Sequence, residues 1–212
     1  QLKKFKNFSF QKLDLKDKNK LSNYFKKNQI DIIFHLAAQA GVRYVSSHPE
    51  KFIESNIFGF HNLIEVSKLY DIKKFFYASS SSVYGDRNKF PVDEKSKLNP
   101  KNIYGLSKKI NEEYILINSN KKTKYIGLRF FTVFGEWGRP DMLILKFLKF
   151  AKNNKTFYLN NMGNHWRDFT YIDDVVENLI RLLNKKFSTH VILNCSNKPI
   201  LIKELIEYLS KK

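Results

Sequence analysis

The feature that most constrains this sequence is its alternation of short apolar runs with longer segments in which apolar residues recur every three or four positions. The first pattern predicts strands and the second predicts amphipathic helices. Strands separated by helices lie parallel, because a parallel neighbour is reached only through a crossover connection. We therefore expect an α/β fold, a parallel sheet covered by helices. The expected strands are 8–13, 31–38, 73–80, 124–130 and 191–196, and the expected helices are 18–28, 49–70, 102–119 and 172–184.

A ligand site is expected where the strands end. In open α/β sheets ligands bind beyond the carboxyl ends of the strands. The segments that follow the expected strands there are 37–44, 79–85 and 131–140. No glycine-rich turn of the G-x-G-x-x-G kind occurs anywhere, and the sequence opens on Gln1 and ends at Lys212 inside a helix-like segment. We therefore expect a fragment that lacks the first βαβ unit of its fold.

The charge of the chain is strongly positive, at +18. Its lysines come as scattered pairs, without a basic stretch interleaved with aromatic residues, so nucleic acid is not the expected partner. The histidines lack metal-ligand spacing, and Asp173 and Asp174 suit a helix start better than a metal. No apolar run is long enough to cross a membrane, and the single Cys195 fits a reducing compartment. We expect a cytoplasmic protein without a metal and away from the membrane.

One pair of residues suggests the chemistry. Tyr104 and Lys108 stand four positions apart at the start of an expected helix, which places them on one helical face. An ammonium beside a phenol lowers the phenol's pKa from about 10, so that the phenolate can remove a proton from an alcohol. Alone, this spacing also occurs on ordinary solvated helix faces. The serine-rich run 79–82 at a strand end adds hydroxyls that can hold a substrate, or that satisfy their own turn.

Four sequence strings carry a family resemblance. They are His-Leu-Ala-Ala at 35–38, Ser-Ser-Ser-Ser-Val-Tyr-Gly at 79–85, Tyr-Gly-Leu-Ser-Lys at 104–108 and Arg-Asp-Phe-Thr-Tyr-Ile-Asp-Asp at 167–174. Together they resemble the extended short-chain dehydrogenases/reductases, the NAD-dependent sugar-nucleotide epimerases and dehydratases. The resemblance implies a Rossmann-like doubly wound sheet with part of a smaller substrate domain. It implies Tyr104 as general base, Lys108 as its pKa-lowering partner, and Ser80 as the hydroxyl that assists proton transfer.

The resemblance also implies a binding site for NAD. Lys108 would bind the nicotinamide ribose and Phe131 would contact the nicotinamide. Asp14 and Leu15 would border the adenine. The residues expected to line the rest of the cofactor are Leu36, Ala37, Ala38, Gln39 and Ser55. Asn56 is expected to position a helix rather than to bind a ligand.

The substrate expectation comes from two longer strings, 39–44 and 128–142, which resemble the UDP-glucuronate 4-epimerases. By this resemblance Thr132 and Arg139 grip the sugar carboxylate, and Arg167 meets the diphosphate. Arg43, Ser82, Ser80 and Tyr104 complete the expected substrate contacts. Alternatively, Arg139 is a turn arginine beside Asp141, and Arg167 pairs with Asp168 or Asp173. Ser82 occupies the position of the acid that related dehydratases carry, which favours epimerisation.

Residues 1–131 and 168–197 are expected to form the NAD-binding domain, and residues 132–167 and 198–212 part of the substrate domain. A homodimer through the helices 49–70 and 102–119 is usual in the family that the sequence resembles. Two other functions stay open. One is a UDP-hexose 4-epimerase, and the other is a catalytically inert fragment or basic binding module.

Overall fold

A computed structural model describes residues 2–41, 47–87, 91–119, 122–187 and 190–211. The chain divides into two compact units. The first comprises Gln1–Gly127 and Phe187–Ile192, and the second comprises Leu128–Lys186 and Leu193–Lys212. Each unit is described by itself.

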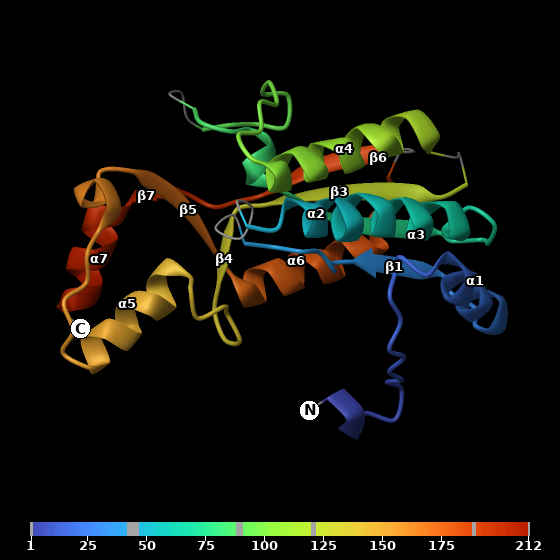
Figure 1. Cartoon of the computed structure of the whole chain (residues 1–212), viewed down its shortest axis with the longest axis horizontal. Coiled ribbons are helices and arrows are strands. Elements are labelled where there is room, and N and C mark those ends of the chain that lie inside the picture. Colours follow the sequence, from blue (N-terminus) through green and yellow to red (C-terminus); the bar gives the residue numbers. More distant parts are fainter. Residues whose placement is uncertain (1, 42–46, 88–90, 120–121, 188–189, 212) are drawn as a thin grey trace. The chain divides into compact units, whose positions relative to one another are not determined.

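Among its described residues, the first unit contains the strands β1 (Ile32–His35) and β2 (Lys74–Ser80), together with four α-helices (Figure 1). The strands pair in parallel, with Ile32 opposite Lys74 and His35 opposite Tyr77. Two further strands, β3 (Lys124–Phe130) and β6 (His190–Cys195), extend the sheet in the order β1-β2-β3-β6, and the chain crosses between the two units within each of them. The expected α/β fold with a parallel sheet is confirmed.

The helices of the first unit are α1 (Lys18–Lys27), α2 (Pro49–Phe52), α3 (Gly59–Ser67) and α4 (Ile103–Asn118). α1 packs against α3, and α4 packs against β2. Buried side chains from these elements form one core, which includes Leu21, Phe60, Ile64, Phe75 and Tyr125. Burying such a side chain contributes about 1.5–3 kcal/mol. The short 3-10 helices η1 (Leu2–Lys4) and η4 (Ser81–Val83) complete the unit.

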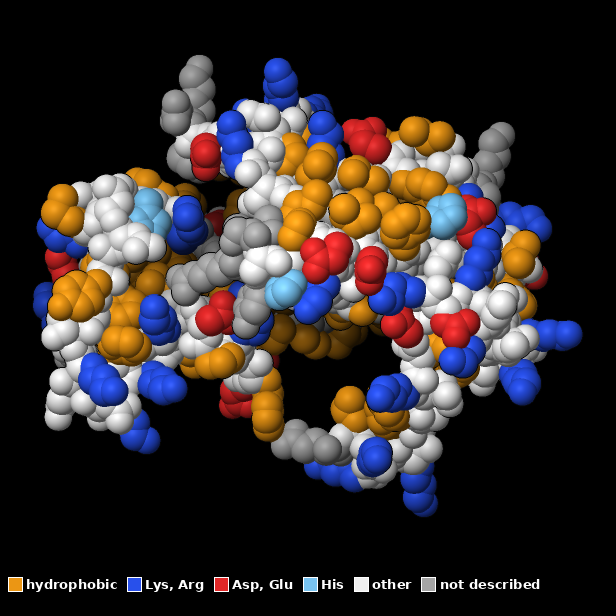
Figure 2. Space-filling model, viewed as in Figure 1, with side chains coloured by type: hydrophobic (Ala, Val, Ile, Leu, Met, Phe, Trp, Pro, Cys, Tyr) orange, Lys and Arg blue, Asp and Glu red, His pale blue; other side chains and the backbone are white. Residues whose placement is uncertain are grey.

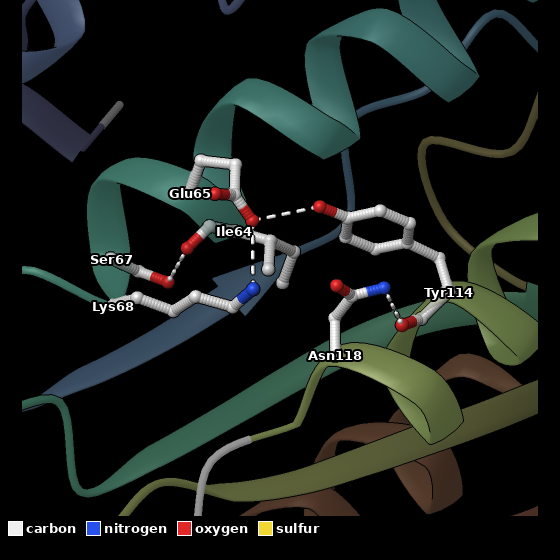
Figure 3. Close-up of polar contacts among 6 residues, drawn as sticks. All are labelled: Ile64, Glu65, Ser67, Lys68, Tyr114 and Asn118. Carbon is white, nitrogen blue, oxygen red and sulfur yellow. Dashed lines mark hydrogen bonds and ion pairs between the residues drawn. The ribbon is translucent and has the colours of Figure 1, made fainter.

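The expected helix 49–70 is a continuous helical path of three pieces. A π-helical stretch, η3 (Ile53–Phe58), joins α2 to α3 and contains the buried Asn56. Such wide turns occur often at functional sites. Glu65 of α3 accepts a hydrogen bond from Tyr114 Oη of α4 at 2.7 Å, and a second one from Lys68 Nζ at the end of its own helix at 2.7 Å (Figure 3). The Glu65–Tyr114 bond therefore links α3 to α4.

The expected strand at 8–13 is wrong. This segment is not a strand, and Phe10 is 69% exposed. A strand is defined by its ladder of hydrogen bonds to a neighbour, and no strand in the described part of the chain pairs with this segment.

The second unit contains a sheet of β4 (Thr132–Phe134), β5 (Trp166–Tyr171) and β7 (Pro199–Leu201) in the order β4-β5-β7. β4 and β5 are parallel, and β5 and β7 are antiparallel. Its helices are α5 (Leu143–Lys152), α6 (Ile172–Asn184) and α7 (Ile202–Ser210), with a short 3-10 helix, η5 (Asn160–Gly163). Asp173 and Asp174 lie in the first turn of α6, where carboxylates stabilise the positive end of the helix dipole.

Candidate functional site

The start of α4 is anchored twice. The Asn102 side chain accepts a hydrogen bond from the backbone N–H of Gly105 at 2.8 Å, which caps the helix. Gly105 also lies against the turn that follows β2, because a Cβ there would stand 2.6 Å from the carbonyl oxygen of Ser82. Only a glycine permits this approach. The helix that carries Tyr104 therefore sits directly on the serine turn 80–82.

Lys108 is the most unusual residue of this helix. It is 1% exposed, and its Nζ has no hydrogen-bond partner within the described residues. Nζ lies 6.0 Å from the centroid of the Tyr104 ring. Burial lowers the pKa of Lys108 to about 8. A buried donor without an acceptor costs about 1–3 kcal/mol. A ligand oxygen or a phenolate that accepts a hydrogen bond from this nitrogen would remove that cost.

The end of β2 holds two buried serines. Ser80 Oγ accepts a hydrogen bond from the backbone N–H of Ser82 at 3.2 Å, and a hydroxyl that accepts one bond can still donate its own proton. Ser79 Oγ donates to Glu112 Oε1 on α4 at 2.5 Å. Glu112 is 1% exposed and was not expected from the sequence as a functional residue. Its spacing was a usable signal, since it stands one turn after Lys108.

The loop after β1 is held by Asn56. The Asn56 side chain accepts from the Gln39 backbone N–H at 2.8 Å and donates to the Gln39 carbonyl at 3.1 Å. Its Nδ2 also donates to Ser107 Oγ on α4 at 3.1 Å. This one amide therefore ties the carboxyl end of β1 to the helix of Tyr104. Nearby, the exposed residues 36–38 follow β1 directly, and Ser55 is half-buried beside Asn56.

The residues expected to border the adenine lie in the segment before α1. The Asp14 carboxylate accepts a hydrogen bond from the Lys16 backbone N–H at 2.9 Å. Leu15 packs against the core, and its Cβ faces Gly59. The structure thus gathers Asp14, Leu15, Ser55, Ser80 and Lys108 in one unit, together with the loop after β1. Arg43 lies outside the described residues.

The other expected site residues belong to the second unit. Phe131 donates its backbone N–H to the carbonyl of Cys195 at 3.3 Å. Thr132 begins β4 and lines a cavity of about 190 Å³ with Gly135, Met142 and Phe169.

The two arginines of this unit differ. Arg139 is bound by Asp141 through Nε and Nη2, each at 3.0 Å, which matches the alternative expectation of a turn arginine. Arg167 donates to the Trp166 carbonyl at 2.9 Å. Its alternative partner Asp168 accepts instead from the Asn197 backbone N–H at 2.9 Å. Within the described residues, Arg167 makes no ion pair with Asp168 or Asp173.

Among the described residues, every helix is too short or too polar to cross a membrane. No group of three or more His, Cys, Asp and Glu side chains among them is placed to hold a metal ion.

The parallel sheet, the strand-end serines and the Tyr104–Lys108 pair define a nucleotide-cofactor enzyme of the α/β class. Residues 1–195 match the model of the NAD dependent epimerase/dehydratase family. The chain belongs to this family. The expectations of an NAD-dependent sugar-nucleotide epimerase, with NAD as its cofactor, are confirmed.

Two relatives define the similarity in sequence. An uncharacterized protein of Methanocaldococcus jannaschii is 43% identical over 100% of this chain and 67% of its own length. UDP-glucuronate 4-epimerase 4 of Arabidopsis thaliana is 42% identical over 81% of this chain and 40% of its own length. The chain thus spans only part of the relatives that it matches.

Two solved structures define the similarity in fold. The UDP-glucuronic acid 4-epimerase of Bacillus cereus, in complex with UDP-glucuronic acid and NAD, superposes with a TM-score of 0.88 at 29% identity. It is covered to 68%, and this chain to 100%. The UDP-glucose 4-epimerase of Thermotoga maritima, with UDP-glucose, gives a TM-score of 0.90 at 26% identity, with 98% of this chain and 69% of that chain covered.

The residues present fit the family's cofactor. Among the described residues no acceptor meets the buried Lys108 Nζ, and a ribose hydroxyl would supply one. The exposed loop 36–38 offers open backbone at the strand end, where such cofactors bind. Both observations concern residues expected to bind the nicotinamide half of NAD or to lie at the strand ends.

Proposed function

We propose that the chain is part of an enzyme that interconverts UDP-glucuronate and UDP-galacturonate by transient oxidation at C4. The observation that carries the chemistry is the buried, unpartnered Lys108 Nζ beside the ring of Tyr104, on a helix seated against the serine turn. The substrate is inferred from the resemblance of 39–44 and 128–142 to UDP-glucuronate 4-epimerases and from the relative in Arabidopsis thaliana.

In this mechanism the side chains move one proton and orient the sugar. Tyr104, as phenolate, takes the proton of the 4-hydroxyl, and Ser80 holds that hydroxyl by a hydrogen bond. Lys108 favours the phenolate by its charge and binds the nicotinamide ribose. Bound NAD would supply the hydride acceptor for C4 and the hydride donor for the return. The 4-keto sugar turns over between the two transfers, and Tyr104 returns its proton to the oxygen.

The carboxylate of the substrate needs a firm grip. A 4-keto uronic acid is a β-keto acid, which loses CO₂ when the carboxylate bond stands perpendicular to the carbonyl plane. A guanidinium fork and a hydroxyl hold a carboxylate in a fixed plane. We assign this role to Arg139 and Thr132, and the diphosphate to Arg167. For Arg139 to act so, the substrate carboxylate must replace or join Asp141, which it now binds.

The test is chromatography of UDP-glucuronate after incubation with NAD and the chain. A second form, extended upstream to supply a glycine-rich turn, is assayed in parallel. We expect UDP-galacturonate with the extended form and none with its Tyr104→Phe variant. The proposal is overturned if neither form converts UDP-glucuronate and neither form converts a neutral UDP-sugar.

A UDP-hexose 4-epimerase is the second candidate, and the Arg139–Asp141 ion pair favours it, because a neutral sugar needs no free guanidinium. Arg139→Ala separates the two. For a uronate enzyme, loss of a charge-assisted fork worth about 1.5–3 kcal/mol lowers kcat/KM for UDP-glucuronate by roughly 10- to 100-fold. Turnover of UDP-glucose stays unchanged in that variant if neutral sugars are the substrates. Arg181→Ala, which removes an exposed arginine paired with Glu177, is the matched control.

The third candidate is a catalytically inert chain, which the absence of a glycine-rich turn from the sequence favours. If the extended form is active and the chain by itself is not, the chain by itself is catalytically inert. Equilibrium titration with NAD separates an inert chain that still binds the cofactor from one that does not.

We also propose a cytoplasmic homodimer. Apolar side chains gather over α3 and α4 on the face shown in Figure 2. Two pairs of exposed apolar residues, each eleven positions apart, form two stripes. One pair is Phe58 at the end of η3 and Leu69 in the turn after α3, and the other is Leu106 and Ile117 on α4. Two stripes held side by side by the Glu65–Tyr114 bond suit a second copy of the same surface.

A further inference from the structure

A buried carboxylate with no part in the proposed proton transfer stands on the catalytic helix. Glu112 is 1% exposed, and its Oε1 accepts the hydroxyl of Ser79, which is 2% exposed, at 2.5 Å. Burying a carboxylate is costly unless it is hydrogen-bonded. Its retention inside the packed α4–β2 contact therefore calls for a role that an apolar side chain does not fill.

The place of this bond in the fold suggests that role. Glu112 stands one helical turn after Lys108 and two turns after Tyr104, on the side of α4 that faces β2. Ser79 directly precedes Ser80 at the end of β2. The bond therefore joins the helix that carries the base to the strand that carries the assisting hydroxyl, next to the residue that must meet the substrate.

Two contacts anchor α4 to the end of β2 and to the turn that follows it. One is at its first turn, where Gly105 rests on the Ser82 carbonyl. A rod fixed at one end can still tilt and rotate about that point. The Ser79–Glu112 bond fixes a second point two turns along. Two points set both the tilt of the helix and its rotation, and with them the positions of the Tyr104 and Lys108 side chains.

We propose that Glu112 is a positioning residue, which acts through Ser79 to set the register of Tyr104 and Lys108 against Ser80. The inference rests on the proposed function for its kinetic test. Misplacing a catalytic group by about 1 Å costs on the order of 100-fold in rate. Loss of the bond should therefore lower kcat much more than it changes the binding of substrate or cofactor.

The experiment compares Ser79→Ala, Glu112→Leu and Glu112→Gln in the form of the protein that is active above. We expect kcat to fall about 10- to 100-fold in Ser79→Ala and Glu112→Leu. KM and the Kd for NAD are expected to change by less than about threefold, since the binding groups remain. Glu112→Gln keeps an oxygen that accepts the Ser79 hydroxyl, so it should restore kcat to within a few-fold of the parent.

Ser67→Ala is the matched control, because Ser67 is an equally buried serine of the same unit. It is 1% exposed, and its Oγ donates to the Ile64 carbonyl at 2.8 Å, on α3 rather than at the catalytic helix (Figure 3). Ser67→Ala should lower Tm about as much as Ser79→Ala and leave kcat unchanged. Equal kcat in the two alanine variants, or failure of Glu112→Gln to restore kcat, would overturn the inference.

A second readout needs no turnover. In protein labelled with 3-fluorotyrosine, the ¹⁹F signal lost in Tyr104→Phe reports the titration of Tyr104. Its midpoint is expected to rise in Ser79→Ala, as Lys108 shifts away, and to stay unchanged in Ser67→Ala. If no UDP-sugar is converted, the proposed function fails while this measurement still decides the role of Glu112. An unshifted midpoint in Ser79→Ala contradicts it.

Discussion

At the scale of single residues, several buried nitrogen atoms of the first unit have no hydrogen-bond partner within the described residues. Lys108 Nζ, His35 Nε2 and Asn111 Nδ2 are all buried and lack hydrogen bonds within the described residues. His35 ends β1 and is 4% exposed. Burial, and secondarily the charge of Lys108, lowers the pKa of His35 to about 3. The histidine is therefore neutral in the folded protein, which leaves the ammonium of Lys108 without a like charge beside it.

This histidine should make the fold sensitive to acid. Because its folded pKa lies below the unfolded value of about 6.5, the unfolded chain takes up the proton first. Stability is therefore complete above about pH 6.5 and falls as the pH is lowered toward 3, by up to about 1.4 kcal/mol per unit for one proton. Urea unfolding of the parent and of His35→Phe at pH 7, 6 and 5 measures the two slopes.

The exposed His48, which faces Glu50, supplies the control variant His48→Phe. Carboxylates titrate mostly below this range, so the difference between slopes isolates the histidine. A parent and a His35→Phe variant with the same slope would show that His35 is not kept neutral by the fold.

At the scale of residues, the sequence predicted contacts between residues that are close together in the chain. Tyr104 and Lys108 are one turn apart, and helical periodicity alone places them together. The bonds of Glu112 to Ser79 and of Asn56 to Gln39 join residues 33 and 17 positions apart, and no periodicity encodes them. The ion pair of Arg139 with Asp141 was weighed as an alternative because it is local.

Among the elements, those with a strong period and clear ends were predicted well. The expected strand 124–130 and helix 172–184 coincide with β3 and α6. The helix 49–70 was predicted as one piece, because the π-helical stretch changes its hydrogen bonds without interrupting its apolar pattern. The strands β4, β5 and β7 were not predicted. β4 and β7 have three residues each, which is too few positions for a period. β5 has six residues, and the charged Arg167 and Asp168 interrupt its apolar pattern.

One glycine decides how closely α4 approaches the serine turn. In the interior of most helices Ala is more stable than Gly by about 1 kcal/mol. At position 105 the added Cβ would stand 2.6 Å from the Ser82 carbonyl, so Gly105→Ala must push α4 off the serine turn. We expect the free energy of unfolding to fall by about 1–3 kcal/mol, with a loss of kcat. Denaturant unfolding and steady-state kinetics measure both.

Gly59→Ala is the control for this prediction, because Gly59 is also a buried helical glycine. Its Cβ would lie 3.3 Å from the Leu15 side chain and, at ordinary van der Waals distance, 3.7 Å from the Glu54 carbonyl oxygen. We expect its unfolding free energy to stay within about 1 kcal/mol of the parent. A Gly105→Ala protein as stable and active as Gly59→Ala would mean that α4 does not depend on this close approach.

For the molecule as a whole, the sequence predicted the core better than it predicted which apolar residues stay exposed. The first unit has one contiguous core of side chains from α1, α3, α4 and the strands, which the apolar pattern foreshadowed. Yet the same pattern places Phe58, Leu69 and Ile117 among apolar residues without telling that they stay exposed. Which apolar face is covered depends on the neighbours that each helix finds, and the fold alone reveals it.

The exposed helical stripes lead to the last prediction, which concerns assembly. Phe58 is 58% exposed and Ile117 is 81% exposed. The Glu65–Tyr114 hydrogen bond links α3 to α4, the helices beside which these residues lie. Removing such side chains from water stabilises association, and a buried unpaired charge opposes it strongly. We expect the parent protein to sediment as a dimer and the Phe58→Asp/Ile117→Asp variant as a monomer. Tyr158→Asp, at a site 85% exposed in the second unit, should leave the dimer intact. If the stripe variant remains dimeric, the two copies meet elsewhere; if the parent itself is a monomer, the stripes of α3 and α4 are not a self-association surface.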